Sequence, residues 1–149
     1  MGFLGGFRYR GALYKRHPVK ILKAVDNDPR CVATYKVNIG DHAEVGDLGT
    51  LKPADLPAAN ILLGGFPCQD FSWCGPRAGL SGKRGGLYKA LVGYMAHHQP
   101  LVAVGENVPN MVQMENGAVW KKIKSDLEGA GYRCKLWKLH AADYGVPQN

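Results

Sequence analysis

The chain has 149 residues, of which 46% are hydrophobic and 21% are charged, the composition of one globular domain. No apolar run approaches the ~20 residues of a membrane helix, and residues 1–7 are too short and glycine-rich for a signal peptide, so we expect a cytoplasmic protein with no membrane partner. The formal net charge of +7 favours a polyanionic partner such as nucleic acid.

The chain begins with a glycine-rich loop over residues 1–6, followed by a predicted helix over residues 7–17 that stops before a proline. The apolar run at residues 20–25 predicts a strand. Asp26, at the tip of that strand, comes twenty positions after Gly6. An acid at about this distance binds a ribose hydroxyl in nucleotide-binding folds, although Asp26 could equally be a solvated turn residue or a local cap.

Asp28 is expected to cap a helix that has Pro29 at its first position and runs to about Asn38. A loop-rich stretch follows over residues 39–59 and carries Asp47. Asp47 could accept a hydrogen bond from an exocyclic amine, or it could be an ordinary surface aspartate in a turn.

A short apolar strand at residues 61–63 leads through two glycines to Pro67 and Cys68. In an open α/β sheet, ligands and chemistry lie at the carboxyl ends of the strands. A thiol there, beside the amino end of the next element, can have a lowered pKa and act as a nucleophile. A cysteine is more often a small buried apolar residue, which is the interpretation we give to Cys31 and Cys134.

The next stretch, residues 66–85, is predicted to be a long loop with hydroxyl and basic side chains among four glycines. These groups suit phosphate contact, and the length of the loop suggests a lid. An ordinary solvated loop is the alternative. No metal site is expected, because Cys68 and Cys74 are six residues apart and no CxxC pair occurs.

A predicted helix at residues 86–98 leads to a strand at residues 101–104, and Glu106 follows this strand. A carboxylate leaving an apolar strand is expected to be half-buried, and burial favours the protonated form that can donate a proton. A structural salt bridge is the alternative. A further helix at residues 117–130 and a strand at residues 132–139 complete the pattern.

Strands alternate with helices throughout, which predicts an α/β fold with a mainly parallel, doubly wound sheet buried on both faces. No strand precedes the first glycine loop, and no helix follows the last predicted strand. We therefore expect a domain that is incomplete at both ends.

These motifs together resemble the DNA (cytosine-5) methyltransferases. The match is specific at residues 64–72 (Gly-Gly-Phe-Pro-Cys-Gln-Asp-Phe-Ser) and at residues 106–108 (Glu-Asn-Val), and it extends to residues 86–88 and 144–148. It follows the family's order over nearly the whole chain. At the first motif the match is poor, because Phe3 stands where the family has a glycine.

The resemblance implies a Rossmann-like fold that uses S-adenosylmethionine as methyl donor. Cys68 would attack C6 of a cytosine flipped out of duplex DNA, and Glu106 would contact N3 and N4 and protonate the ring. The implied cofactor-binding residues are Phe3, Gly5, Gly6, Phe7, Asp26 at the ribose, Asn27 and Asp47 at the adenine, and Pro67. The candidate DNA contacts are Gln69, Ser72, Arg77 and Arg84.

The family continues into an arginine-bearing motif, a target-recognition region and a last helix, none of which occurs in residues 1–149. We therefore expect a partial catalytic domain of prokaryotic or phage restriction–modification type, acting as a fragment or with a second chain. Two alternatives stay open. One is a non-catalytic nucleic-acid or cofactor-binding remnant, and the other is a tRNA-cytosine methyltransferase with the same Pro-Cys-Gln chemistry.

Overall fold

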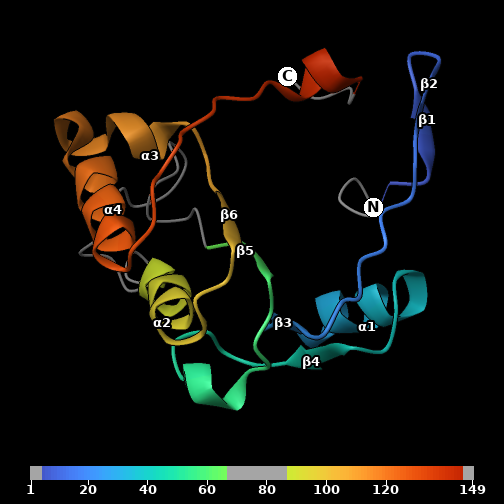
Figure 1. Ribbon diagram of the computed structural model, residues 1–149, viewed down its shortest axis with the longest axis horizontal. Coiled ribbons are helices and arrows are strands. Elements are labelled where there is room, and N and C mark those ends of the chain that lie inside the picture. Colours follow the sequence, from blue (N-terminus) through green and yellow to red (C-terminus); the bar gives the residue numbers. More distant parts are fainter. Residues whose placement is uncertain (1–4, 67–86, 146–149) are drawn as a thin grey trace. The chain divides into compact units, whose positions relative to one another are not determined.

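The computed structural model describes residues 5–66 and 87–145 (Figure 1). The chain divides into two compact units, residues 1–47 and residues 48–149. Each unit is built around its own pair of parallel strands. Within the described residues, no helix is long and apolar enough to cross a membrane.

The first unit opens with a β-hairpin of β1 (Phe7–Tyr9) and β2 (Ala12–Tyr14). The helix predicted over residues 7–17 is therefore wrong. The physical reason lies in the two-residue turn, where Arg10 and Gly11 have φ of 47° and 79°. Two left-handed residues match the twist of a hairpin, while glycine inside a helix is unfavourable. An aromatic ring from each strand also stacks on the other at a centroid distance of 5.0 Å.

The rest of this unit is a strand–helix–strand arrangement of β3 (Ala24–Asp26), α1 (Pro29–Asn38) and β4 (Ala43–Val45). β3 and β4 are parallel. The predicted strand before α1 is confirmed but shorter than expected, and β4 lies in the stretch expected to be loop-rich. The buried side chains of this unit among the described residues are Val32 and Ala43.

The start of α1 is as predicted. Asp28 has extended backbone and its side chain accepts a hydrogen bond from the Arg30 N–H at 2.8 Å, with Pro29 at the first helical position. The Arg30 guanidinium also bonds the Asp28 carboxylate and holds the pKa of Asp28 below its usual value. Cys31, in the first turn of the helix, is exposed, so the expectation that it is buried is wrong.

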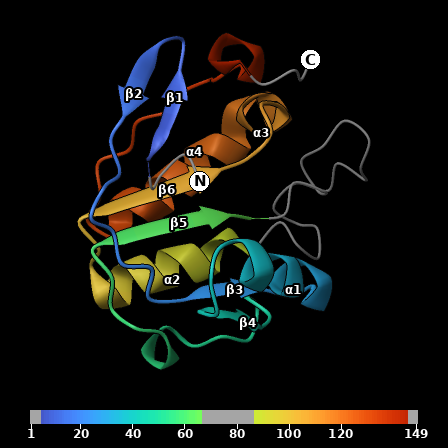
Figure 2. The same ribbon diagram turned by 90° about the vertical axis from the view of Figure 1, so that its right-hand side faces the viewer.

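The second unit contains the parallel pair β5 (Ile61–Gly65) and β6 (Val102–Glu106), which lie side by side in Figure 2. The register runs from Ile61 opposite Val102 to Gly65 opposite Glu106. Both strands are confirmed, and each extends two residues further at its carboxyl end than predicted. The two strands therefore end side by side.

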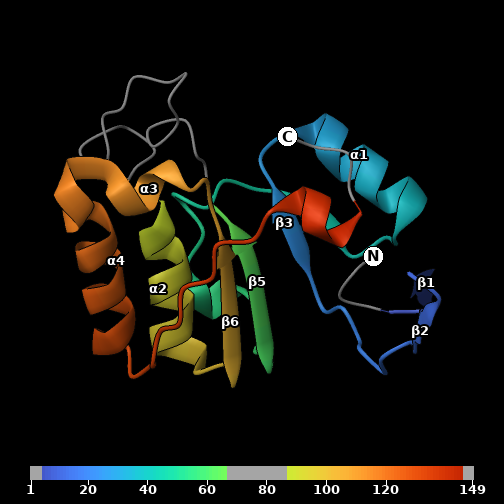
Figure 3. The same cartoon turned by 90° about the horizontal axis from the view of Figure 1, so that it is seen from above.

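Two predicted helices, α2 (Tyr88–His98) and α4 (Ala118–Gly129), are confirmed and lie on the same side of the β5–β6 pair (Figure 3). Gly64 lets α2 approach β5, because a Cβ atom there would lie 2.7 Å from Cδ2 of Leu91. On the other face the apolar side chains of the pair are 39% to 51% exposed. Burial on both faces, as expected from the sequence, is wrong for this pair.

A single hydrophobic core joins the carboxyl end of β5 to the helices. Its buried members come from the residue after β5, from α2, from α3 (Asn110–Gln113) and from α4, and they are Phe66, Tyr88, Met111, Val119 and Ile123. A short 3₁₀ segment, η4 (Met114–Gly117), joins α3 to α4. Two further 3₁₀ turns are η2 (Pro53–Asp55) and η5 (Ala141–Tyr144).

The strand predicted at residues 132–139 is wrong. The chain there has no regular structure and pairs with no strand among the described residues. Its apolar side chains are exposed, with Trp137 at 64% and Leu139 at 67%. An apolar alternation forms a strand only where a neighbouring strand and a packed face are available. Cys134, expected to be buried in that strand, is half-buried in coil.

Candidate functional site

The carboxyl ends of β5 and β6 bring Glu106 beside the backbone that leads toward Cys68. Glu106 is the last residue of β6 and pairs with Gly65, the last residue of β5. Its Oε2 atom lies 3.5 Å from the point that a Cβ on Gly65 would occupy, so the carboxylate lies against the glycine. Glu106 is exposed, so the expectation of half-burial is wrong.

Asn107, which sequence reasoning gave no role, joins the two strand ends. Its Nδ2 donates to the Phe66 carbonyl at 3.0 Å, and its Oδ1 accepts from the Val108 N–H at 2.9 Å. Both hydrogen bonds are partly buried. The only signal in the sequence was the position of Asn107 inside the Glu-Asn-Val motif.

The aromatic ring of Phe66 is held in the core at the start of α2. Phe66 is 8% exposed and its ring centroid lies 6.2 Å from that of Tyr88, which is 2% exposed. The Tyr88 hydroxyl donates to Oδ2 of Asp126 at 2.6 Å, and Lys122 bonds Oδ1 of the same carboxylate at 2.5 Å. Phe66 and Tyr88, near the ends of the two described segments that flank residues 67–86, are thus fixed to one core.

This hydrogen-bond network shifts the pKa of Tyr88 and the pKa of Asp126. Burial, reinforced by the hydrogen bond to Asp126, raises the pKa of Tyr88 well above its usual value. The Lys122 ammonium, followed by the Tyr88 hydroxyl, lowers the pKa of Asp126. Tyr88 therefore stays a neutral hydrogen-bond donor, and Asp126 stays an ionised acceptor, over the physiological range.

In the first unit, Asp26 lines a cavity of about 280 Å³ formed by β3, α1 and β4. Oδ1 of Asp26 accepts a hydrogen bond from the Asp28 N–H at 2.8 Å. Asp26 is therefore a local cap, as one of the two interpretations expected. It also lines a cavity, which a ligand-binding role would require. The lining residues, apart from Asp26, are Ala24, Val25, Cys31, Val32, Tyr35 and Ala43.

Asn27 and Asp47 lie near the same end of this parallel pair. Asn27 directly follows Asp26 and is exposed. The Gly46 N–H donates to the Asp26 carbonyl at 3.0 Å, which brings the backbone before Asp47 to the end of β3. The structure therefore gathers Asp26, Asn27 and Asp47 at one end of one strand pair.

The glycine loop leads into the β-hairpin. The Gly6 N–H donates to the Tyr14 carbonyl at 2.7 Å. Gly5 has a left-handed φ of 68°, and a Cβ there would collide with the Lys15 carbonyl. Gly5 and Gly6 therefore lead directly into the hairpin, whose first residue is Phe7. The cofactor role of these three residues stays a prediction.

Several predicted site residues lie outside the described part of the chain. They are Phe3, Pro67, Cys68, Gln69, Ser72, Arg77 and Arg84. Their roles stay predictions.

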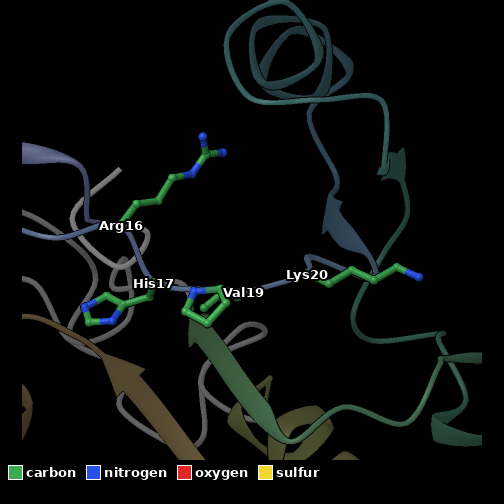
Figure 4. Close-up of a pocket in the computed structure, with 5 residues that line it drawn as sticks. Arg16, His17, Val19 and Lys20 are labelled. Atoms are coloured by element: carbon green, nitrogen blue, oxygen red, sulfur yellow. The ribbon is translucent and has the colours of Figure 1, made fainter.

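A second hollow, of about 430 Å³, lies along a basic segment of the first unit and is lined by residues 16–20 (Figure 4). The Arg16 and Lys20 side chains extend in different directions. Their charges do not converge on one point, so this hollow lacks the arrangement of a specific anion site. Among the described residues, no group of three His, Cys, Asp or Glu side chains could hold a metal ion.

Comparisons with known proteins agree with the motif pattern. The family model of the C-5 cytosine-specific DNA methylases matches residues 2–149. The Type II methyltransferase M.NgoFVII of Neisseria gonorrhoeae is 38% identical over 117 residues, covering 77% of this chain and 31% of the relative. The Type II methyltransferase M1.ScrFI of Lactococcus lactis subsp. cremoris is 33% identical over 146 residues, covering 98% of this chain and 37% of the relative.

The fold is also that of a solved methyltransferase. The crystal structure of the S. pombe Dnmt2 methyltransferase superposes with a TM-score of 0.54 at 23% identity, covering 73% of this chain and 35% of that chain. This likeness confirms the Rossmann-like α/β fold. The chain spans about a third of the length of the curated relatives it matches.

Proposed function

Because the chain belongs to the C-5 cytosine-specific DNA methylase family, we propose that it carries the catalytic groups that methylate C5 of cytosine in duplex DNA. The observation that supports this most is the adjacent ends of β5 and β6. Gly65 and Glu106 are paired there, and Asn107 fixes the Phe66 carbonyl. Cys68 follows Phe66 by two residues, and a chain extends by at most ~3.6 Å per residue. A thiol and a carboxylate can therefore act on one base.

In this proposal Cys68 is the nucleophile and Glu106 the acid. The target cytosine leaves the duplex to reach them. The Cys68 thiolate adds to C6, which forms a carbon–sulfur bond and moves an electron pair into the ring. Glu106 stabilises that charge at N3 and N4 by donating a proton or a hydrogen bond. C5 becomes nucleophilic and would take the methyl group from the sulfonium of bound S-adenosylmethionine, which would leave as the thioether. The C5 proton passes to water, the C5–C6 double bond re-forms as the Cys68 thiolate leaves, and the proton donated by Glu106 returns to it.

The residues around Asp26 fit the adenosine part of S-adenosylmethionine. The cavity is lined mostly by apolar side chains and includes the carboxylate of Asp26, which can accept hydrogen bonds from the hydroxyl groups of a nucleoside. Asn27 and Asp47 lie near the same strand end and would contact the adenine. S-adenosylmethionine, when bound, supplies the methyl group. Phe3, Gly5, Gly6, Phe7 and Pro67 complete the proposed cofactor set.

DNA would be held by the segment after Cys68. Its polar and basic side chains suit contact with phosphates and with the opened duplex, and the net charge of +7 supports binding to a polyanion. The proposed contacts are Gln69, Ser72, Arg77 and Arg84. We further propose that sequence recognition depends on residues beyond 1–149 or on a second chain, because the relatives are about three times as long.

A methyl-transfer assay tests this function. The chain is mixed with a cytosine-rich duplex and S-adenosylmethionine labelled on its methyl group, and label is counted on the DNA. We expect label with the native chain, none with Cys68→Ala, and a large loss with Glu106→Gln. Cys134→Ser and Glu115→Gln make comparable chemical changes away from the site and should retain activity. No label with the native chain would favour a non-catalytic binding module, and equal labelling by Cys68→Ala would contradict Cys68 as the nucleophile.

A further inference from the structure

We infer that Asn107 is a positioning residue, whose amide fixes the peptide bond between Phe66 and Pro67 and so holds the backbone leading to Cys68 beside Glu106. This inference rests on the proposed function. It concerns a residue that touches neither base nor cofactor in that proposal. The evidence starts with the last hydrogen bonds between the two strands.

The ladder between β5 and β6 ends at Gly65 and Glu106. Beyond that pair, the bond from Asn107 Nδ2 to the Phe66 carbonyl, at 3.0 Å, extends the connection by one residue with a side chain. The contact joins residues 41 positions apart in the sequence. It is therefore a specific link between the two strand ends and not a local turn.

Asn107 bonds to the peptide unit between Phe66 and Pro67, which offers a single hydrogen-bonding group. Proline has no N–H, so the Phe66 carbonyl is the sole hydrogen-bonding group of the peptide between residues 66 and 67. The Phe66 ring is anchored separately, by packing against Tyr88. The ring and the carbonyl of Phe66 are thus held by two different contacts, and the Asn107 amide holds the carbonyl.

The amide of Asn107 is itself fixed in one orientation. Its Oδ1 accepts from the Val108 N–H at 2.9 Å, so its Nδ2 must face Phe66. A carbonyl can only accept, and an N–H can only donate, so the two partners require an amide at this position. The carboxylate introduced by Asn107→Asp would keep the bond to Val108 and lose the bond to Phe66.

Asn107→Asp therefore tests the positioning role, because it removes the bond to Phe66 and keeps the bond to Val108. The matched control is Asn116→Asp, which makes the same change at an exposed residue of η4. Both variants and the native chain react with a mixed-sequence duplex containing 5-fluorocytosine and with S-adenosylmethionine. The rate of covalent adduct formation is measured against DNA concentration. The urea midpoint of each protein is recorded beside it.

We expect the limiting adduct rate of Asn107→Asp to fall by ~10- to 100-fold, the usual effect of a displaced reacting group. The half-saturating DNA concentration should stay at the native value, since Asn107 is not a DNA contact. Asn116→Asp should match the native chain in both. A native limiting rate in Asn107→Asp would overturn the inference and leave the proposed function standing. No adduct with any of the three proteins would instead contradict the function.

A second measurement needs neither DNA nor turnover. Alkylation of each cysteine by iodoacetamide is followed peptide by peptide in the native chain, Asn107→Asp and Asn116→Asp. We expect Asn107→Asp to change the alkylation rate of Cys68 and to leave that of Cys31 unchanged, because the lost bond lies next to Cys68 alone. Equal Cys68 rates in all three proteins would overturn the positioning role. A changed Cys31 rate would show general loosening instead, which also contradicts it.

Discussion

The strand ends of the two units are stabilised in different ways. At the end of β3, the Asp26 side chain bonds the Asp28 N–H and the Asp28 side chain bonds Arg30, so these side-chain hydrogen bonds all lie within residues 26–30. At the end of β5, Asn107 bonds Phe66 across 41 positions. The first end is supported by local turns beside a cavity, and the second by contacts between distant segments over a hydrophobic core.

This difference corresponds to the two tasks proposed for the units. A cofactor that enters and leaves needs a cavity whose edges are preformed by local structure. A nucleophile and an acid that act on one ring need a fixed separation, which only long-range contacts can enforce. Four substitutions, from the largest expected effect to the smallest, test whether the two units depend on these different contacts.

Ile123→Ala should have the largest effect, because it removes a side chain that is 3% exposed at the centre of the second unit. We expect the free energy of unfolding to fall by ~2–5 kcal/mol, measured by urea denaturation. The control Val37→Ala changes a residue of α1 that is 86% exposed and should stay within ~0.5 kcal/mol of the native value. A loss for Ile123→Ala no larger than the control would contradict the role of this core.

Gly64→Ala tests how closely α2 approaches β5. The new methyl group would lie 2.7 Å from Cδ2 of Leu91, and overpacking of this kind lowers the free energy of unfolding by ~1–3 kcal/mol. In the double variant with Leu91→Ala the two losses should not add, because the smaller side chain relieves the collision. Full additivity would show that the collision does not limit packing here.

Asp28→Ala tests the local support of the first unit. It removes the side chain that caps α1 and binds Arg30, so the unfolding midpoint should fall, but by less than in Gly64→Ala. Asp41→Ala, at an exposed position outside the helix, is the control. If the Asp28→Ala midpoint equals that of the control, the cap does not stabilise this unit.

Lys122→Met should have the smallest effect, and that effect should depend on pH. Lys122 lowers the pKa of Asp126, so the pair stabilises the fold above the unfolded pKa of aspartate and loses that effect as pH falls through the lower folded value. Because Lys122 is 56% exposed, we expect only ~0.3–0.5 kcal/mol at neutral pH. The difference should vanish in strong acid, below the folded pKa of Asp126, and Lys121→Met should show none. A difference that persists in acid would exclude the ion pair as its cause.

The parts of the fold that depend on residues close together in the sequence could be predicted. The cap at Asp28, the apolar strands around residues 61–63 and 101–104, and the helices α2 and α4 each follow from a local pattern. The hairpin at residues 7–14 and the coil at residues 132–139 could not, because their sequences suit more than one structure and tertiary contacts decide between them.

The same distinction between local patterns and tertiary contacts applies to the candidate site. The positions of Glu106 and Asp26 at strand ends could be predicted, because an acidic residue after a short apolar run is visible within a few positions. The exposure of Glu106 and the bond from Asn107 to Phe66 could not be predicted, since both depend on how β5 and β6 pair. The register between these two distant strands is not encoded in any short window of the sequence.

The most direct test of the account is to locate the covalent bond to the target base. The native chain is incubated with a 5-fluorocytosine duplex and S-adenosylmethionine, digested, and the nucleotide-bearing peptide is identified by mass spectrometry. The account predicts that the nucleotide is attached to Cys68, that Cys68→Ala forms no adduct, and that Cys134→Ser forms as much as the native chain. Attachment to another residue, or equal adduct with Cys68→Ala, would contradict it.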